Sequence, residues 1–205
     1  MVPDPGTFKV LPWAPETAWV MCDLYMRDGT PFPLAPRAIL KKQLEELSKE
    51  GMRFIAGLEV EWYLTRLVDD NLTTGSLGAP GTPGDPPVVA PVARGYNYLL
   101  EDHLDAIDVA LRPIRRAIEG LGLPLRSFDD EWAPSQIETT FDILEGLAAA
   151  DSAAMLRMAV KQVARRTGYM ASFMCTPAIP GFYGSGWHLH TSLNDLHGRN
   201  VMIPG

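Results

Sequence analysis

The chain contains little cysteine, no cluster of basic residues and no long apolar segment. Its two cysteines, Cys22 and Cys175, have apolar neighbours, which predicts reduced, buried thiols and no disulfide. No apolar run approaches the roughly 20 residues that cross a membrane, and the N-terminus lacks the basic-then-apolar pattern of an export signal. A net charge of −7 disfavours nucleic acid and anionic membranes as partners. We therefore expect a soluble, cytoplasmic protein.

The composition that remains is ordinary for a globular protein, with 46% hydrophobic and 21% charged residues in 205. This length predicts one domain of moderate size or part of a larger one. Helical spacing of apolar residues predicts helices at 37–49, at 98–121 and from 144 or 151 to 167. Pro113 predicts a kink or a break in the second. Residues 1–16 are expected to be irregular, 69–94 to form a Gly/Pro-rich loop, and 18–25, 58–64, 169–175 and 184–193 to be extended.

The helical patterns also predict which side chains are buried. On the first helix they are Ile39, Leu40, Leu44 and Leu47, and on the third they are Met155, Met158 and Val163. His103 lies beside the apolar stripe of the second helix, and we expect it to be a surface or capping residue and not a metal ligand.

The most informative segment runs from Gly184 to Leu193, Gly-Ser-Gly-Trp-His-Leu-His-Thr-Ser-Leu. As a strand it has a polar face with His188, His190 and Ser192. The other face, mostly buried and apolar, holds Trp187, Leu189, Thr191 and Leu193. Two histidines two residues apart can reach one small volume and bind a metal or a phosphate-bearing ligand. Two histidines with satisfied hydrogen bonds at a sheet edge are the structural alternative.

Two acidic segments precede the histidine segment. Strand alternation places Glu59 and Glu61 on one face of the first, although such a pair is also typical of a solvated strand face. The second holds Glu131 and Glu138, seven residues apart, and Pro134 between them interrupts the strand. Because the path bends there, we expect both carboxylates to point into one cavity.

Four carboxylates with one or two imidazoles form the oxygen-rich ligand set that suits Mg²⁺ or Mn²⁺. A zinc site would more often use cysteine or a third histidine. The three segments together therefore predict a site for a hard divalent cation.

In this order the segments resemble the catalytic domain of the glutamine synthetase family. The family's patterns are Glu-x-Glu, Glu-x-Gly-Pro-Gly-Gln-x-Glu and Gly-Ser-Gly-x-His-x-His-x-Ser-Leu, and here they stand as Glu59–Glu61, Glu131–Glu138 and Gly184–Leu193. The opening is similar to the family's lead-in, notably Cys22-Asp23-Leu24 and Asp28-Gly29-Thr30-Pro31-Phe32. The resemblance thus spans nearly the whole chain.

The resemblance implies an α+β fold, a partly open antiparallel β-barrel with helices on its outside. Residues 1–33 would be the lead-in, and 34–205 the N-terminal portion of the catalytic domain, with the Gly/Pro-rich loop at 71–95. The family forms stacked rings, which implies a homo-oligomer.

The resemblance also implies two metal sites. Glu61, Glu131 and Glu138 match the ligands of the first site, which holds the substrate end. Glu59 and His188 match two of the three protein ligands of the second site, which binds the nucleotide phosphates. Mg²⁺ or Mn²⁺ would be the metal.

The remaining matches concern the substrates. His190 and Ser192 match positions that line the ATP site, Gly184 lies in the loop that faces the amino-acid substrate, and Glu131 matches the carboxylate that holds ammonium or takes its proton. The implied reaction is ATP-dependent amide formation through γ-glutamyl phosphate, from glutamate or a related acid and ammonia or another amine.

The chain departs from the family in particular places. Ala133 and Ser135 replace two glycines, and Tyr183 replaces the asparagine common before Gly-Ser-Gly, which favours another acceptor amine or another acid. Family members also extend beyond both ends of the matched segment. We therefore expect a partial catalytic domain whose turnover alone is negligible.

Two alternatives remain open. A catalytically inert, glutamine-synthetase-like binding or scaffold protein would be distinguished by whether Mn²⁺ and ATP bind and whether Glu61→Ala abolishes that binding. A cupin-like β-barrel metalloprotein also uses His-x-His, but its pattern has a glutamate a few residues later, where Thr191-Ser192-Leu193-Asn194-Asp195 stands here.

Overall fold

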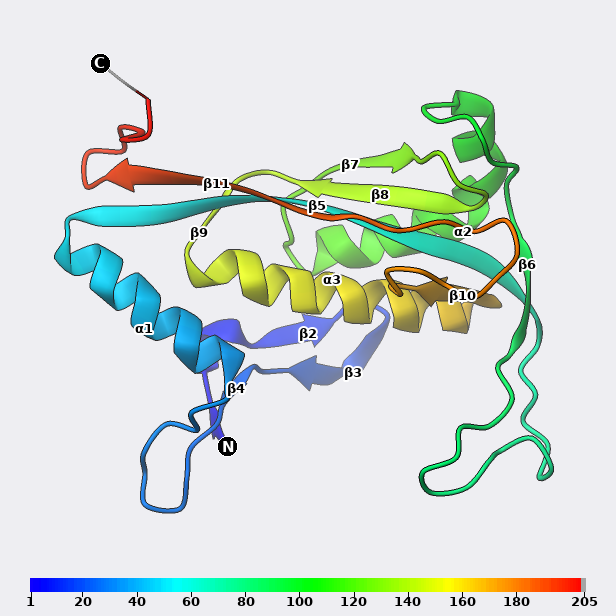
Figure 1. Ribbon diagram of the computed structural model, residues 1–205, viewed down its shortest axis with the longest axis horizontal. Helices are drawn as coiled ribbons and strands as arrows, with labels where there is room; N and C mark the ends of the chain where they lie inside the picture. The colour runs from blue at the N-terminus through cyan, green and yellow to red at the C-terminus, as the bar shows by residue number, and fades with distance from the viewer. Residues whose placement is uncertain (204–205) are drawn as a thin grey trace.

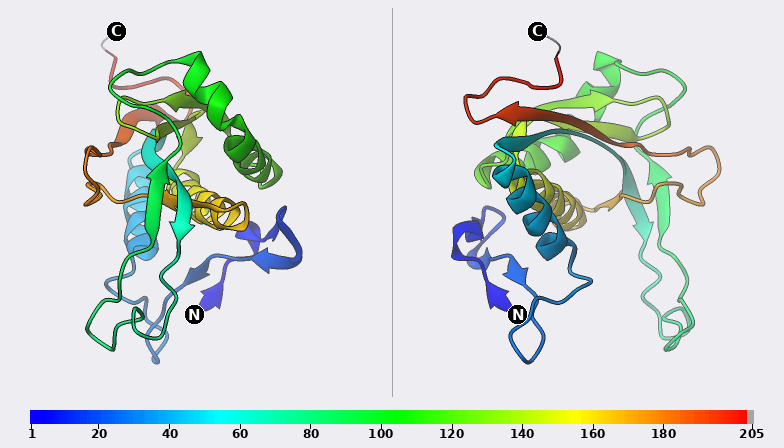
Figure 2. Two further views of the ribbon diagram at one scale, coloured as in Figure 1. Left: turned by 90° about the vertical axis from the view of Figure 1, so that its right-hand side faces the viewer. Right: turned by 60° about the vertical axis from the view of Figure 1, so that its left-hand side comes forward.

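The computed structural model describes residues 1–203, which adopt an α+β fold around one long strand, β5 (Met52–Asp69). β5 belongs to an antiparallel seven-stranded sheet with the central order β10-β5-β8-β7. The other strands are β6 (Val88–Pro91), β7 (Leu125–Asp130), β8 (Gln136–Phe141), β9 (Leu144–Glu145), β10 (Tyr169–Ser172) and β11 (Trp187–Asp195). The sheet curls into an open half-barrel (Figures 1 and 2), which confirms the predicted fold class.

Side-chain alternation along β5 separates the core from the opposite face of the sheet. Val60, Trp62 and Leu64 are fully buried in the core beneath α2 (Glu101–Gly120) and α3 (Leu147–Arg166). The indole N–H of Trp62 donates to the Thr139 hydroxyl on β8 at 2.8 Å, so its polar atom is satisfied in the core. Each large apolar side chain buried in this way contributes about 2 kcal/mol. The intervening residues Glu59 and Glu61 are thereby directed to the other face.

The helices agree with the sequence patterns in position and differ in detail. α1 spans Pro36–Lys49, and α2 is one continuous helix that contains Pro113. Val109, whose carbonyl would accept the missing Pro113 hydrogen bond, lies on the exposed side, where water can bind that carbonyl. His103 lies in the first turn of α2 and contacts the buried carboxylate of Asp130 at 3.2 Å.

Two predictions of buried helical side chains are wrong. Ile39 on α1 and Met158 on α3 are both more than one-third exposed, and the other three residues of the α1 stripe are only partly buried. α1 packs along one side of β5 and α3, so only part of its apolar stripe meets another element. Figure 1 shows α1 at the margin of the fold, where little covers its outer side.

The first 23 residues contain more regular structure than their prolines suggest. They form two small two-stranded sheets and one 3-10 turn, built from β1 (Val2–Pro3), η1 (Pro5–Thr7), β2 (Lys9–Leu11), β3 (Ala14–Trp19) and β4 (Cys22–Asp23). The expected continuous strand at 18–25 is therefore wrong. The chain turns at Asp28-Gly29, with a positive φ of 87° at Gly29 and a 2.7 Å hydrogen bond from Met26 N–H to the Thr30 carbonyl.

Arg37 fixes this N-terminal segment to the helices. Its guanidinium binds Asp4 and Asp23, each at 2.7 Å, and Asp151 at the start of α3 at 3.0 Å. The Arg37 guanidinium holds the pKa of Asp4 below its usual range. The pKa of Asp23 is also lowered, chiefly by a hydrogen bond from Lys41 and further by Arg37. One arginine of α1 thus joins the lead-in to α3.

Three further sequence expectations need correction. The loop after β5 ends in β6, which pairs back with β5 at Thr65–Asp69, because Val88–Pro91 is apolar enough to extend the sheet. Cys175 is exposed and Cys22 half-buried, and both thiols are free. The apolar face of β11 is not core, since Trp187 is 46% and Leu189 57% exposed at the sheet margin. No described helix is long and apolar enough to cross a membrane.

Candidate functional site

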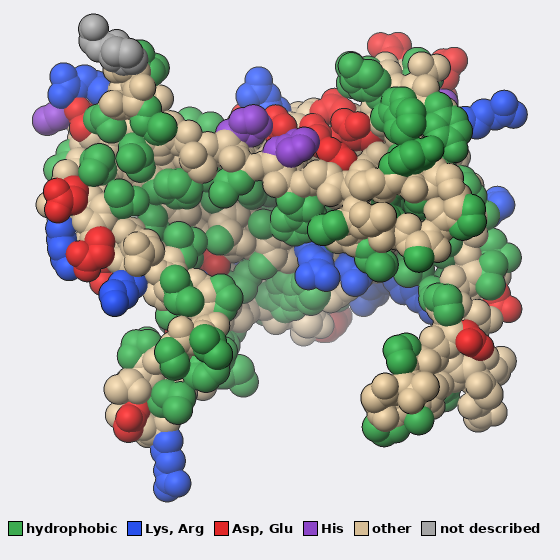
Figure 3. Space-filling view, in the orientation of Figure 1, with side chains coloured by type: hydrophobic (Ala, Val, Ile, Leu, Met, Phe, Trp, Pro, Cys, Tyr) green, Lys and Arg blue, Asp and Glu red, His purple; other side chains and the backbone are tan. Residues whose placement is uncertain are grey.

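Strand register gathers the predicted acidic and histidine residues on one face of the sheet. Glu61 on β5 lies directly opposite Glu138 on β8, and Glu59 lies opposite His188 on β11. β5 is the shared neighbour, with β8 on one side and β11 on the other. Figure 3 shows the result as a group of acidic and histidine side chains on one surface of the molecule.

These side chains form two overlapping groups. Ligand atoms of Glu61, Glu131 and Glu138 all lie within 4.8 Å of one another, and so do those of Glu59, Glu138 and His188. The His188 ring nitrogens lie 3.4 Å from Glu59 and 3.9 Å from both Glu61 and Glu138. Glu138 therefore belongs to both groups, a feature that the sequence patterns did not predict.

A tight hairpin brings Glu131 beside Glu138. The chain reverses between β7 and β8, with Glu131 N–H donating to the Gln136 carbonyl at 3.0 Å. We expected a bent strand; the chain instead reverses completely, which brings carboxylate oxygens of Glu131 and Glu138 within 4.8 Å of each other. Ser135 occupies this turn with a positive φ of 65°, the conformation that favours glycine. This explains why the family's pattern has a glycine at this position. The Ser135 hydroxyl offsets the strain by accepting the Val92 N–H at 2.8 Å.

The carboxylates repel one another in a partly desolvated space. Burial raises the pKa of Glu138 from its usual 4.5 to about 7, with Glu131, Glu59 and Glu61 adding to the effect. Burial likewise raises the pKa of Glu131. Glu59 differs because His190 hydrogen-bonds to it at 3.1 Å and lowers its pKa. A bound divalent cation would neutralise this excess negative charge.

The glycine-rich loop before β11 is tied to the same cluster. Gln136, which is buried, donates from its side-chain amide to Glu61 at 2.8 Å and to the Gly184 carbonyl at 3.0 Å. The buried Tyr63 hydroxyl both donates to the Tyr183 carbonyl and accepts from its N–H, each at 2.9 Å. Neither Gln136 nor Tyr63 was predicted to have a role, although each lies within a segment that the patterns singled out.

Gly186 is a glycine because the chain passes directly against the cluster. A Cβ there would lie 2.5 Å from His188 Nε2 and 2.6 Å from Glu61 Oε1. Both atoms are side-chain ends, so the backbone would remain and the two side chains would have to move. Gly186→Ala is expected to weaken Mn²⁺ binding about tenfold with little loss of stability, measured by calorimetric titration and by thermal unfolding. Gly75→Ala, where an added Cβ would meet nothing within 4 Å, tests whether an alanine at any glycine has this effect.

His190 and Ser192 continue along β11 on the side of His188. His190 pairs with Gly57 and Ser192 with Ile55. A groove of about 510 Å³ lies beside His190, and its lining also includes Glu59 and Glu138. The groove thus adjoins the acidic cluster and lies over β5, β7 and β8, and His190 is the residue that β11 contributes to it.

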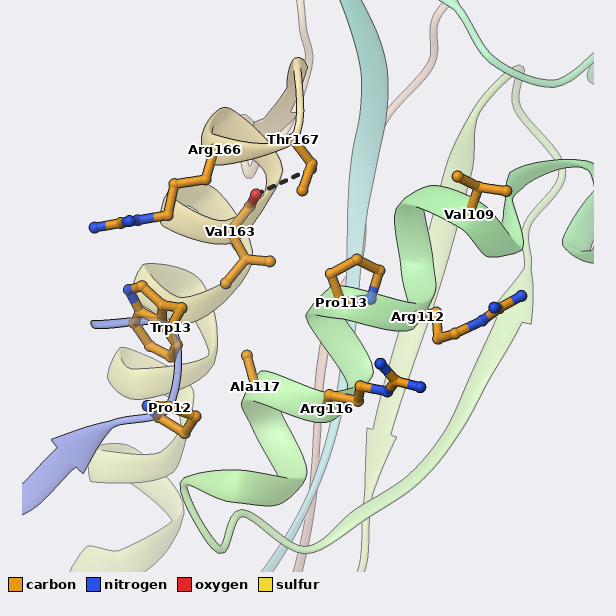
Figure 4. A pocket seen from close by; sticks show the side chains of 10 residues that line it. All are labelled: Pro12, Trp13, Val109, Arg112, Pro113, Arg116, Ala117, Val163, Arg166 and Thr167. Carbon is orange, nitrogen blue, oxygen red and sulfur yellow. Dashed lines mark hydrogen bonds between the residues drawn. The ribbon is translucent and has the colours of Figure 1, made fainter. Parts of the chain in front are cut away.

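A second pocket, of about 490 Å³, lies away from this cluster between α2 and α3 (Figure 4). Pro12 and Trp13 of the N-terminal segment reach into it, and its charged lining residues are Arg112, Arg116 and Arg166. Arginines repel a divalent cation, so this pocket does not compete with the acidic cluster as a metal site.

The fold and the cluster together define a class: an α+β half-barrel that presents carboxylates and histidine from three strands and one turn as a candidate divalent cation centre. The sequence profile of the family described as glutamine synthetase, catalytic domain, matches residues 33–204. The chain belongs to this family.

Individual relatives support this assignment. The chain is 56% identical over 206 residues to a γ-glutamylanilide synthase of Acinetobacter, covering 100% of this chain and 41% of that protein. It is 36% identical to the glutamine synthetase of Methanosarcina mazei, covering 97% and 41%. The solved structure of GmaS without ligand matches with a TM-score of 0.80 at 28% identity, covering 99% and 44%. The chain therefore spans about two-fifths of the length of these relatives.

Proposed function

We propose that this chain supplies the cation-binding part of an ATP-dependent ligase that joins the γ-carboxylate of glutamate to ammonia or another amine. The observation that carries the proposal is the convergence of Glu61, Glu131 and Glu138 within 4.8 Å, beside Glu59 and His188. Family membership supports the ligase class. That the whole protein is a homo-oligomer remains a prediction.

The donor set fits two hard divalent cations. Glu61, Glu131 and Glu138 would hold the first, and Glu59 with His188 would hold the second, while Glu138 lies close enough to serve either. When bound, the cations supply the positive charge that allows a carboxylate to approach a triphosphate. Because the donors are mostly carboxylate oxygens, Mg²⁺ or Mn²⁺ is the proposed metal.

The chain's own residues then position the reactants. In the first step a glutamate carboxylate oxygen bonds to the γ-phosphorus of ATP, and ADP leaves. In the second the amine nitrogen bonds to the acyl carbon, the carbon–oxygen bond to phosphate breaks, and phosphate leaves. The nitrogen loses one proton, for which Glu131 is the proposed acceptor. His190 and Ser192 would lie along the nucleotide, and Gly184 at the amino acid.

The proposal can be tested in a chimera that has the full length of a related enzyme. The 206 matching residues of the Acinetobacter synthase would be replaced by this chain, and γ-glutamyl products would be identified by mass spectrometry with ATP, glutamate and either ammonia or an added amine. We expect product that depends on ATP and on Mg²⁺ or Mn²⁺. The same exchange carrying Glu131→Gln is the matched negative control. A folded chimera that binds Mn²⁺ but forms no γ-glutamyl product would contradict the ligase assignment and favour an inert binding protein.

A further inference from the structure

Three aromatic side chains from distant segments meet at the surface beside the acidic cluster. The ring centroids of Trp132 and Tyr183 lie 4.9 Å apart, those of Tyr96 and Trp132 5.4 Å, and those of Tyr96 and Tyr183 6.2 Å. Every pair meets edge to face. The residues Tyr96, Trp132 and Tyr183, here called the aromatic trio, are 54%, 43% and 47% exposed. Figure 3 shows a large hydrophobic group beside the acidic surface.

The trio is held in place by its backbone. Tyr96 N–H donates to the Trp132 carbonyl at 2.6 Å, and Tyr96 has a positive φ of 72°, which is rare for an aromatic residue. The preceding residue must be glycine, since a Cβ on Gly95 would overlap the backbone of Pro134. Strain of this kind is stored where the surrounding structure requires one arrangement, and it concentrates at functional sites.

The trio adjoins the reaction centre on two sides. Trp132 follows Glu131, and its backbone N–H donates to the Glu131 carboxylate at 3.1 Å. Tyr183 precedes Gly184. The side-chain amide of Gln136 donates to both the Gly184 carbonyl and the Glu61 carboxylate. A group bound against the trio would therefore lie between Glu131, the proposed proton acceptor, and the loop that contains Gly184.

The fold does not use these rings as core. Their sequence neighbours Ala133 and Phe182 point inward instead and pack with the buried Tyr63. Alternation thus directs one set of side chains into the protein and leaves Trp132 and Tyr183 half in water. Exposing grouped aromatic area costs free energy that a bound apolar group would recover.

We propose that the aromatic trio binds the ring of an aromatic acceptor amine, whose amino group then faces Glu131. This inference rests on the proposed function and names the class of amine that it uses. A neutral arylamine needs no counter-charge, and its ring can pack on the edges and faces that the trio presents. An alkylammonium ion would instead require ring faces around a hollow, whereas these rings already pack against one another.

The test uses the 205-residue chain with Mg²⁺ at neutral pH. Ligand-observed NMR titrations would compare aniline with cyclohexylamine, which has a similar size, lacks the aromatic ring and is protonated. We expect aniline to bind at least about tenfold more tightly. Trp132→Leu and Tyr183→Asn should each weaken aniline binding about tenfold, while Tyr183→Phe keeps the ring and retains it. Phe8→Leu alters an exposed aromatic side chain in the lead-in and serves as the matched control.

Mn²⁺ titration of the same variants separates this inference from the proposed function. All variants of the trio should bind Mn²⁺ as the unmodified chain does. If Mn²⁺ binds but aniline does not, or if cyclohexylamine binds equally well, the trio has no such role and the ligase proposal stands. If Trp132→Leu and Tyr183→Asn leave aniline affinity unchanged, the ring binds elsewhere and the inference is overturned. If aniline binds through the trio but Mn²⁺ binds nowhere, the proposed function fails instead.

Discussion

Replacing Glu61 by glutamine is expected to weaken Mn²⁺ binding roughly a hundredfold or more. Loss of a ligand should exceed the roughly 10- to 100-fold effect of changing a residue that only hydrogen-bonds to a ligand. Glu61 lies between Glu138 and His188, and its carboxylate is mostly buried, with 13% of the side chain exposed. Glutamine retains the shape and can still accept the Gln136 hydrogen bond, so the change removes charge without opening a cavity. Calorimetric titration with Mn²⁺ measures the loss, and Glu61→Ala should produce a similar result.

Glu45→Gln is the matched control, because Glu45 is an exposed glutamate on α1. Its Mn²⁺ affinity should equal that of the unmodified chain. A Glu61→Gln protein that is folded and binds Mn²⁺ within threefold of the unmodified chain would refute the placement of Glu61 in a cation site. An inert scaffold could also bind ATP, and Mn²⁺ through Glu61. The binding test named from the sequence therefore does not separate it from a ligase, whereas the product assay does.

The second large effect is a dependence on pH centred on Glu138. Its pKa is about 7 in the folded protein and 4.5 when unperturbed, so between these values the folded state holds a proton that the unfolded state has released. Stability should therefore fall as pH rises from 4.5 to 7. The shift corresponds to at most about 3 kcal/mol, and access of water to the groove reduces this to roughly 2 kcal/mol.

Glu138→Gln should consequently stabilise the metal-free protein at pH 8 by roughly 1–2 kcal/mol and have little effect near pH 4.5, as measured by urea unfolding with a chelator present. Mn²⁺ binding to the unmodified chain should be about tenfold weaker at pH 6 than at pH 8, because the cation must displace this proton. Equal stability of Glu138→Gln and the unmodified chain at pH 8 would show that the carboxylate is neither buried nor crowded as described.

The sequence predicted the grouping of the acidic and histidine side chains better than it predicted the surfaces around them. Alternation in Glu59-Val60-Glu61 and in the histidine strand depends only on the two-residue period of a strand, so the shared face followed directly. Register cannot be read from that period. That Glu61 lies opposite Glu138, and that Glu138 therefore belongs to both groups, became evident only when β5, β8 and β11 were aligned.

The predictions that failed concern what covers a side chain. The apolar face of β11 has the composition of core, yet Trp187 and Leu189 lie at the sheet margin. Ile39 and Cys175 are exposed for the same kind of reason, since apolar composition does not say whether a neighbouring element packs over it. The aromatic trio was also missed, because Tyr96, Trp132 and Tyr183 are far apart in sequence and only Tyr183 was recognised as unusual.

The central claim is that Glu61, Glu131 and Glu138 hold one divalent cation, with a second beside Glu59 and His188. Anomalous diffraction from crystals of the chain grown with Mn²⁺ tests it most directly. We predict one strong peak within coordination distance of the first three carboxylates and another beside Glu59 and His188. Peaks only at other sites, with these carboxylates turned toward bulk solvent, would contradict the account.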